Sequence, residues 1–279
     1  MSGSTFFARA GRVCGLTIFV IYLMVGGCKD SGRVAPAGDD RPDGCLISDD
    51  NHLFWGIVGD TGTVLDKECF IINHNDEGKI PAWVAYYLSV ENLAGSAERT
   101  DDFRPDPELA ESLRAELADY RGSGYDRGHN APAACFKRSE AAMSATFLLS
   151  NMSPQTPLLN RGKWRQLEQY IRDITEGAGA AWIFTGNLFL DGDSQAVSPA
   201  VFIGPGRVAV PTHCFKAILT ITPDSVFSAE AFLLPNVFDS IDGDRIDYAL
   251  PVDRLEELSG YDFFPLLPDS IEATIETVN

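Results

Sequence analysis

The chain has 279 residues, 45% of them hydrophobic and 22% charged, a balance that is ordinary for a folded globular protein and excludes collagen-like, coiled-coil and wholly disordered chains. With 22 lysine and arginine residues against 40 aspartate and glutamate residues, the formal net charge is -18. Binding to nucleic acid needs positive charge that faces the phosphates, so the overall charge argues against a general nucleic-acid coat protein.

The first 28 residues have the pattern of an export signal. Arg9 and Arg12 precede a continuous apolar run of 13 residues, 15–27. This run is too short for a membrane-spanning helix, which needs about 20 residues, and suits the apolar region of a signal peptide, which has about 7–15. The run ends in a V-G-G-C tetrapeptide that resembles the lipobox of bacterial lipoproteins and predicts lipidation of Cys28. A plain cleaved signal and an uncleaved anchor are the alternatives.

Residues 29–44 are polar and contain glycine and proline, which is typical of a flexible tether. A single domain is therefore expected over residues 45–279. Together with the signal, this organisation predicts an exported protein, either a cell-envelope lipoprotein held to a membrane by its lipid or a secreted one.

Four cysteines remain once Cys14 has left with the signal and Cys28 carries lipid. An even number of cysteines in an exported chain suggests disulfides. Among the three connectivities, the sequence favours Cys45–Cys69, the nearest pair, with Cys135–Cys214 second. Free buried cysteines are the alternative.

The rest of the chain mixes strand and helix patterns, which predicts an α+β domain. Runs rich in apolar, aromatic and β-branched residues predict strands over residues 83–90, 145–149, 181–185, 207–210 and 215–222. Leucines at four-residue spacing after a proline predict a helix over residues 107–120. Residues 160–175 carry an apolar stripe and predict a second, longer helix.

His129 is the histidine whose surroundings point to chemistry. It follows Asp126, Arg127 and Gly128, so an imidazole, a guanidinium and a carboxylate lie within four residues. Histidine can act as a base near neutral pH, and the forked donors of arginine match a phosphate. The other histidines have contexts that favour a structural or bystander role: His52, His74 and His213.

Further motifs follow in order: DYRGSGYDRGH at 119–129, APA at 131–133, FLLSNMSPQ at 147–155, then Asn160, Trp164 and Glu168. Together they resemble the non-specific DNA/RNA endonuclease family with the ββα-metal (His-Me finger) fold, which includes mitochondrial endonuclease G and secreted bacterial nucleases. The resemblance covers roughly residues 80–220. It implies an antiparallel sheet flanked by helices and a phosphodiester hydrolase that takes DNA and RNA as substrates.

The resemblance also implies a role for each matching residue. His129 is expected to be the general base, and Asn160 the protein ligand of a single Mg²⁺, for which Mn²⁺ could substitute. Glu168 is expected to hold the waters of the metal and Asn151 to support the site. The scissile phosphate is expected to contact Arg127 and Arg99, with Arg104 as the competitor of Arg99.

The same residues have less specific interpretations. Asn160 could be a helix N-cap, and Glu168 could be a solvated helix residue paired with Arg165 or Arg172. A catalytically inactive member of the fold that binds nucleic acid, an envelope lipoprotein that binds a protein partner, and a nuclease effector held by an immunity protein are the alternative functions. The family resemblance also allows a homodimer, but no motif marks its interface.

Overall fold

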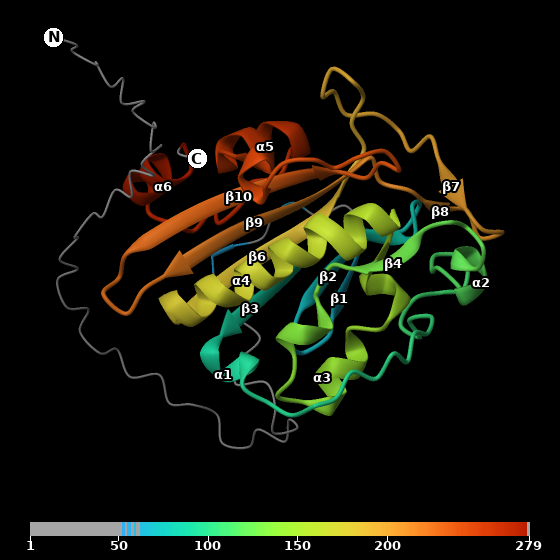
Figure 1. The fold of residues 1–279 in the computed structure, drawn as a ribbon, viewed down its shortest axis with the longest axis horizontal. Helices are drawn as coiled ribbons and strands as arrows, with labels where there is room; N and C mark the ends of the chain where they lie inside the picture. Colours follow the sequence, from blue (N-terminus) through green and yellow to red (C-terminus); the bar gives the residue numbers. More distant parts are fainter. Residues whose placement is uncertain (1–51, 54, 57–58, 60–61, 278–279) are drawn as a thin grey trace, which may run out of the picture.

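The computed structural model describes residues 52–53, 55–56, 59 and 62–277 (Figure 1). The expected signal peptide, Cys28, the tether and Cys45 all lie outside these residues, so their predictions stay open. Within the described part, no helix combines the length and apolar character needed to cross a membrane.

The domain is built on one seven-stranded antiparallel sheet with the strand order β1-β2-β3-β6-β9-β10-β11 (Figure 1). Its strands are β1 (Thr63–Asp66), β2 (Ile71–Asn75), β3 (Ile80–Ser89), β6 (Ala180–Leu188), β9 (His213–Ile221), β10 (Phe227–Pro235) and β11 (Ala249–Leu250). The expected strands over 83–90, 181–185 and 215–222 thus form its centre. The expected strand over 207–210 is the short β8 (Val208–Ala209), which pairs with β7 (Phe202–Ile203).

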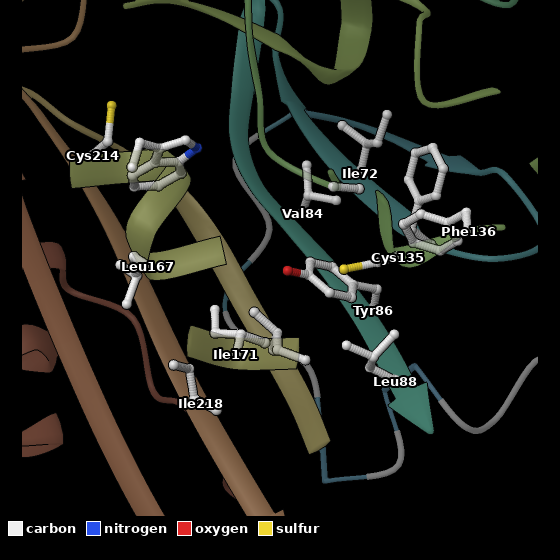
Figure 2. Close-up of a cluster of buried hydrophobic side chains, with 14 of the residues drawn as sticks. Ile72, Val84, Tyr86, Leu88, Cys135, Phe136, Leu167, Ile171, Cys214 and Ile218 are labelled. Atoms are coloured by element: carbon white, nitrogen blue, oxygen red, sulfur yellow. The ribbon is translucent and has the colours of Figure 1, made fainter. Parts of the chain in front are cut away.

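Both faces of the sheet are buried, so a central strand such as β3 is apolar on both sides. Val84, Tyr86 and Leu88 point into one core, and the alternate residues Trp83 and Ala85 point into the other, as a two-residue strand period requires. Figure 2 shows the first core, where Leu167 and Ile171 of helix α4 (Arg165–Ala178) pack over the strands. Helices α5 (Val252–Ser259) and α6 (Asp269–Ile275) cover the second core.

A separate two-stranded hairpin precedes α4. Strand β4 (Asp126–His129) pairs antiparallel with β5 (Met152–Gln155), placing His129 opposite Met152. The chain then enters a short π-helical segment, η3 (Leu159–Trp164), which continues directly into α4. The expected helix over 160–175 is therefore present, and the hairpin with its helix forms the ββα unit that the α+β prediction requires. The remaining elements are α1 (Val90–Leu93), α2 (Leu117–Tyr120), η1 (Ala133–Cys135), α3 (Glu140–Ala145), η2 (Leu149–Asn151) and η4 (Arg245–Tyr248).

The helix expected over residues 107–120 is wrong over most of its length, because only Leu117–Tyr120 is helical. The preceding residues form turns anchored at the fully buried Asp106. Its carboxylate pairs with Lys67 at 2.9 Å and accepts bonds from Ser150 and the Glu108 amide. Such side-chain bonds to nearby backbone compete with the helical pattern, and here they replace it.

The strand expected over residues 145–149 is also wrong. Residue 145 ends α3, and Leu149 begins the 3₁₀ turn η2, so only Leu148 makes an isolated bridge, to Arg104. A short apolar run does not distinguish a strand from any other fully buried segment. This one is apolar because Phe147 and Leu149 are buried in the cores beside the β4–β5 hairpin.

The pairing Cys135–Cys214 is contradicted, because both cysteines are free and buried. Cys135 lies beside Tyr86 in the first core (Figure 2), whereas the thiol of Cys214 contacts Gln155 and Asn187. Cys69 is disulfide-bonded, and its expected partner, Cys45, lies outside the described residues.

Burial should make the two free thiols unreactive in the native protein. It raises the pKa of the Cys135 thiol to about 11 and that of the Cys214 thiol to about 12, so almost no thiolate forms at neutral pH. We expect iodoacetamide to label neither residue before denaturation and both after it, without any reductant, as read by peptide mass spectrometry. An unreduced peptide linking Cys135 to Cys214 would contradict the assignment.

Candidate active site

The imidazole of His129 ends strand β4 between two phenyl rings. The ring centroids of Phe103 and Phe147 lie 5.7 Å and 5.0 Å from that of His129, both in edge-to-face geometry. The residue is 8% exposed, and its Nε2 atom has no hydrogen-bond partner in the described part of the chain. The ring is therefore held by packing between the two phenyl rings.

Each of these phenyl rings also carries a guanidinium. Arg127 lies 3.9 Å from the centroid of Phe103, and Arg99 lies 4.8 Å from that of Phe147. Arg104, the competitor of Arg99, instead binds Asp102 and a backbone carbonyl of α3. Of these two candidates the structure thus brings Arg99, and not Arg104, to the aromatic rings beside His129.

This environment keeps His129 neutral. Burial, followed by the positive charges of Arg99 and Arg127, lowers its pKa to about 3. An imidazole that is neutral over the physiological range is able to accept a proton. Arg127 can donate to an anion placed beside the ring, and Arg99, whose Nε donates to Asp101 at 2.7 Å, keeps its other guanidinium nitrogens for one.

Asp126, at the start of the same strand, holds Asn160. The amide nitrogen Nδ2 of Asn160 donates to Oδ2 of Asp126 at 3.0 Å, and Arg161 donates to both oxygens of that carboxylate at 2.7 and 2.6 Å. Because its nitrogen is engaged, the amide of Asn160 presents its carbonyl oxygen as the free ligand atom. A neutral oxygen of this kind suits a hard divalent cation.

Glu168 lies in the first turn of α4 and is half-buried. Burial raises the pKa of its carboxyl, and the positive charges of Lys216, Arg172, Arg99 and Arg165 oppose that rise. These cations act through charge, without a direct hydrogen bond to the carboxylate. Its oxygens thus stay available for water or for an ion.

The segment between Asn160 and Glu168 is not an ideal α-helix. The residues from Leu159 to Trp164 are π-helical, and Gly162 has non-helical backbone angles, φ -103° and ψ -107°. The axial separation of about 12 Å that eight α-helical residues would give does not apply here. π-helical turns recur at functional sites, and this one carries Asn160.

Asn151 holds in place the segment that follows strand β4. Its Nδ2 donates to the carbonyls of Ala131 and Thr146 at 2.9 and 2.8 Å, and its Oδ1 accepts from the Ala131 amide at 2.9 Å. The side chain is fully buried, so these bonds position the chain after His129 and leave no contact with a substrate. The side-chain amide of the neighbouring Asn130 donates to the Asn151 carbonyl at 3.1 Å and to the Ser153 hydroxyl at 2.9 Å.

One charged residue near Glu168 was not anticipated from the sequence. Lys216 of β9 is fully buried with its ammonium 4.3 Å from the Trp164 ring centroid, and burial lowers its pKa to about 8. Its charge acts on the Glu168 carboxylate, as do those of Arg165 and Arg172, which the sequence had offered as partners of Glu168. A lysine inside an apolar strand gives no such signal in the sequence.

A cavity of about 350 Å³ opens beside Arg127. Tyr120, Arg121 and Tyr125 contribute to its wall. Arg121 and Arg127 line it together with the carboxylate of Asp126, and it offers room for groups that flank a bound phosphate.

Replacing Asn151 with alanine should destabilise the domain, because three buried backbone groups lose their partners. Each unsatisfied group costs about 1–3 kcal/mol, so we expect a loss of at least about 2 kcal/mol in the free energy of unfolding. That loss should lower the melting temperature by roughly 4 °C or more. Gln166→Ala, at an exposed position of α4, is the control and should melt like the parent. Equal melting of both variants would contradict this role.

The chain is similar to known nucleases over most of its length. The family model described as DNA/RNA non-specific endonuclease matches residues 56–270. Nuclease C1 of Cunninghamella echinulata var. echinulata is 35% identical over 218 residues, covering 75% of this chain and 86% of that protein. Human mitochondrial endonuclease G is 36% identical over 217 residues, which cover 76% of this chain and 72% of that protein.

A solved structure agrees with these relatives. The crystal structure of the EndoG/EndoGI complex contains a chain that superposes with a TM-score of 0.72 at 28% identity and covers 79% of this chain and 92% of its own length. The match supports the α+β architecture with its ββα unit. Since the family model spans most of the chain and the relatives match over most of their own length, this protein belongs to the DNA/RNA non-specific endonucleases.

Proposed function

We propose that this chain is a Mg²⁺-dependent endonuclease that hydrolyses phosphodiester bonds of DNA and RNA at the site formed by His129, Asn160 and Glu168. Nuclease activity follows from the family, whereas the residue roles and the metal are inferences from geometry. One observation carries them: the neutral imidazole of His129 lies on the strand whose first residue, Asp126, holds Asn160.

His129 and the two arginines have different roles in the proposed hydrolysis. His129, kept neutral by burial and by its two arginines, accepts the proton of the attacking water. Arg127 and Arg99, each stacked on a phenyl ring, bind the phosphate and stabilise the negative charge that grows on it during attack. These contacts address the backbone and carry no sequence information, so we expect little base preference.

The donor set fits a small divalent cation. Asn160 offers its free carbonyl oxygen, and Glu168 a carboxylate without a direct hydrogen bond from its basic neighbours. Few protein ligands and oxygen donors suit Mg²⁺, which keeps several of its waters, and Mn²⁺ accepts the same donors. When bound, the ion supplies charge that stabilises the phosphate under attack.

His129→Ala should abolish the proton transfer and leave binding intact. Loss of a general base costs about 10²- to 10⁴-fold in rate, so we expect at least a hundredfold slower plasmid degradation in Mg²⁺. His213→Ala is the matched control, since this half-buried imidazole bonds only to Thr212 among the described residues. Full activity of His129→Ala would contradict the role of His129 as the base, and a parent without activity would support the catalytically inactive alternative.

Asp126→Ala should release the amide of Asn160 and weaken the metal site. Loss of a residue that orients a ligand costs about 10- to 100-fold in metal affinity, so the Mg²⁺ concentration for half-maximal activity should rise by that factor. Arg161→Ala is the control, because it removes the ion pair with Asp126 but not the bond to Asn160. An unchanged Mg²⁺ requirement in Asp126→Ala would contradict the proposal.

We also propose export and lipid anchoring, supported by the apolar run over 15–27 and the V-G-G-C tetrapeptide at Cys28. Metabolic labelling with a fatty acid, compared between the parent and Cys28→Ser, tests the anchor. We expect label in the parent and none in Cys28→Ser. Absence of label from both proteins would contradict the lipid anchor and favour a signal peptide that is cleaved without lipidation. Such an enzyme would degrade nucleic acid outside the cytosol.

A further inference from the structure

Three carboxylates meet on the face of the sheet away from His129. Asp253 and Glu256 belong to α5, and Glu276 follows the last turn of α6. Each contributes one oxygen atom, and these three atoms lie within 4.8 Å of one another. Figure 1 shows the two helices side by side along β10, on the opposite side of the sheet from α4.

The charges around this cluster are acidic. Within the described residues, those that act on Glu276 come from Glu256, Glu272, Asp253 and Asp262. The nearest basic residue along α5 is Arg254, and its guanidinium is engaged with Glu257 at 2.6 Å. The cluster thus gathers negative charge that no basic side chain is assigned to balance in this part of the chain.

Glu276 supplies an independent sign that a ligand belongs here. It is 1% exposed, yet its Oε1 atom has no hydrogen-bond partner among the described residues. A buried carboxylate oxygen without a partner is costly, because it loses water and gains nothing in return. Its carboxylate points at the oxygens of Asp253 and Glu256, so a cation between them would satisfy it.

We propose that Asp253, Glu256 and Glu276 form a calcium site that joins α5 to the end of α6. Calcium binds oxygen at about 2.3–2.6 Å, so two ligands of one ion stand at most roughly 5 Å apart. The three oxygens, all within 4.8 Å of one another, fall inside that limit. Magnesium demands near-ideal octahedral geometry and usually keeps several waters, so a set of protein carboxylates favours calcium. Glu256 can serve with Oε2, since its Oε1 accepts from the Phe263 amide.

The site would strengthen a weakly anchored helix. Helix α6 has seven residues, and none of them is fully buried. Ile271 and Ile275 pack only partly on the second core, and one long backbone bond of 3.4 Å, from the Asp253 amide to the Glu276 carbonyl, links its end to α5. So short a helix depends on tertiary contacts for its stability, and a bound ion would add three ligand bonds across this junction.

Protons are the competitors of the ion. Burial and then the surrounding carboxylates raise the pKa of Glu256 to about 7 and that of Glu276 to about 8. Metal binding to such a set releases protons, which distinguishes an ion site from a pair of carboxyls that simply share hydrogen bonds.

The test is calcium binding by the purified protein carrying Asn160→Ala, which removes the other expected cation ligand. Isothermal titration calorimetry with CaCl₂ should give one site with a dissociation constant on the order of 10⁻⁴ M, a value between those of calcium sensors and extracellular modules. Proton release and a higher melting temperature should accompany binding. Magnesium at the same concentration should give a smaller rise.

Glu276→Gln and, separately, Asp253→Asn should weaken calcium binding at least tenfold. Glu257→Gln is the matched control on α5, because Glu257 is bound to Arg254 outside the cluster, and it should bind calcium like the parent. The proposal is overturned if calcium changes neither heat nor melting temperature, or if Glu257→Gln loses binding as much as the cluster variants. A third result would also overturn it: Glu276→Gln melts at a higher temperature than the parent, and calcium changes the melting temperature of neither protein. That result is expected if the carboxyl groups share a proton and bind no ion.

Discussion

The site depends on the joint between strand β4 and the helix that follows the hairpin. Two hydrogen bonds make it: Asp126 accepts from the Asn160 amide at 3.0 Å, and the indole nitrogen of Trp164 donates to the His129 carbonyl at 3.0 Å. One bond lies at each end of the strand, so they fix both its position and its rotation relative to the helix. Because Trp164 is fully buried, the core of the domain and the active site share this anchor.

The aromatic residues around His129 give the joint its electrostatic character. Phe103 and Phe147 exclude water from the imidazole, and each holds one guanidinium next to it. In such a place of low polarity, charges act more strongly on one another than in water. The same packing thus lowers the pKa of the base and keeps two phosphate-binding groups in place. A buried positive charge, Lys216, accompanies Glu168 on the helix side.

The strongly patterned parts of the fold were predictable. The central strands follow from apolar runs and α4 from its apolar stripe, and His129, Asn160 and Glu168 were proposed because several motifs follow one another in the order of the family. The turns over residues 107–114 escaped prediction, since the buried Lys67–Asp106 pair that anchors them joins positions 39 residues apart. The need for a glycine at position 128 also escaped prediction: the residue has strand geometry, and a Cβ there would lie 2.2 Å from the Gln155 side chain.

The central claim is that a metal on the Asn160 amide and the imidazole of His129 serve one phosphate. Anomalous diffraction from a crystal soaked in Mn²⁺ tests it most directly, because the ion is then located without assumptions about activity. The account predicts a peak at bonding distance from Oδ1 of Asn160, on the side of Glu168 and facing His129. A well-ordered peak elsewhere in the domain with none at Asn160, or an Asn160 whose oxygen points away from His129, would contradict it.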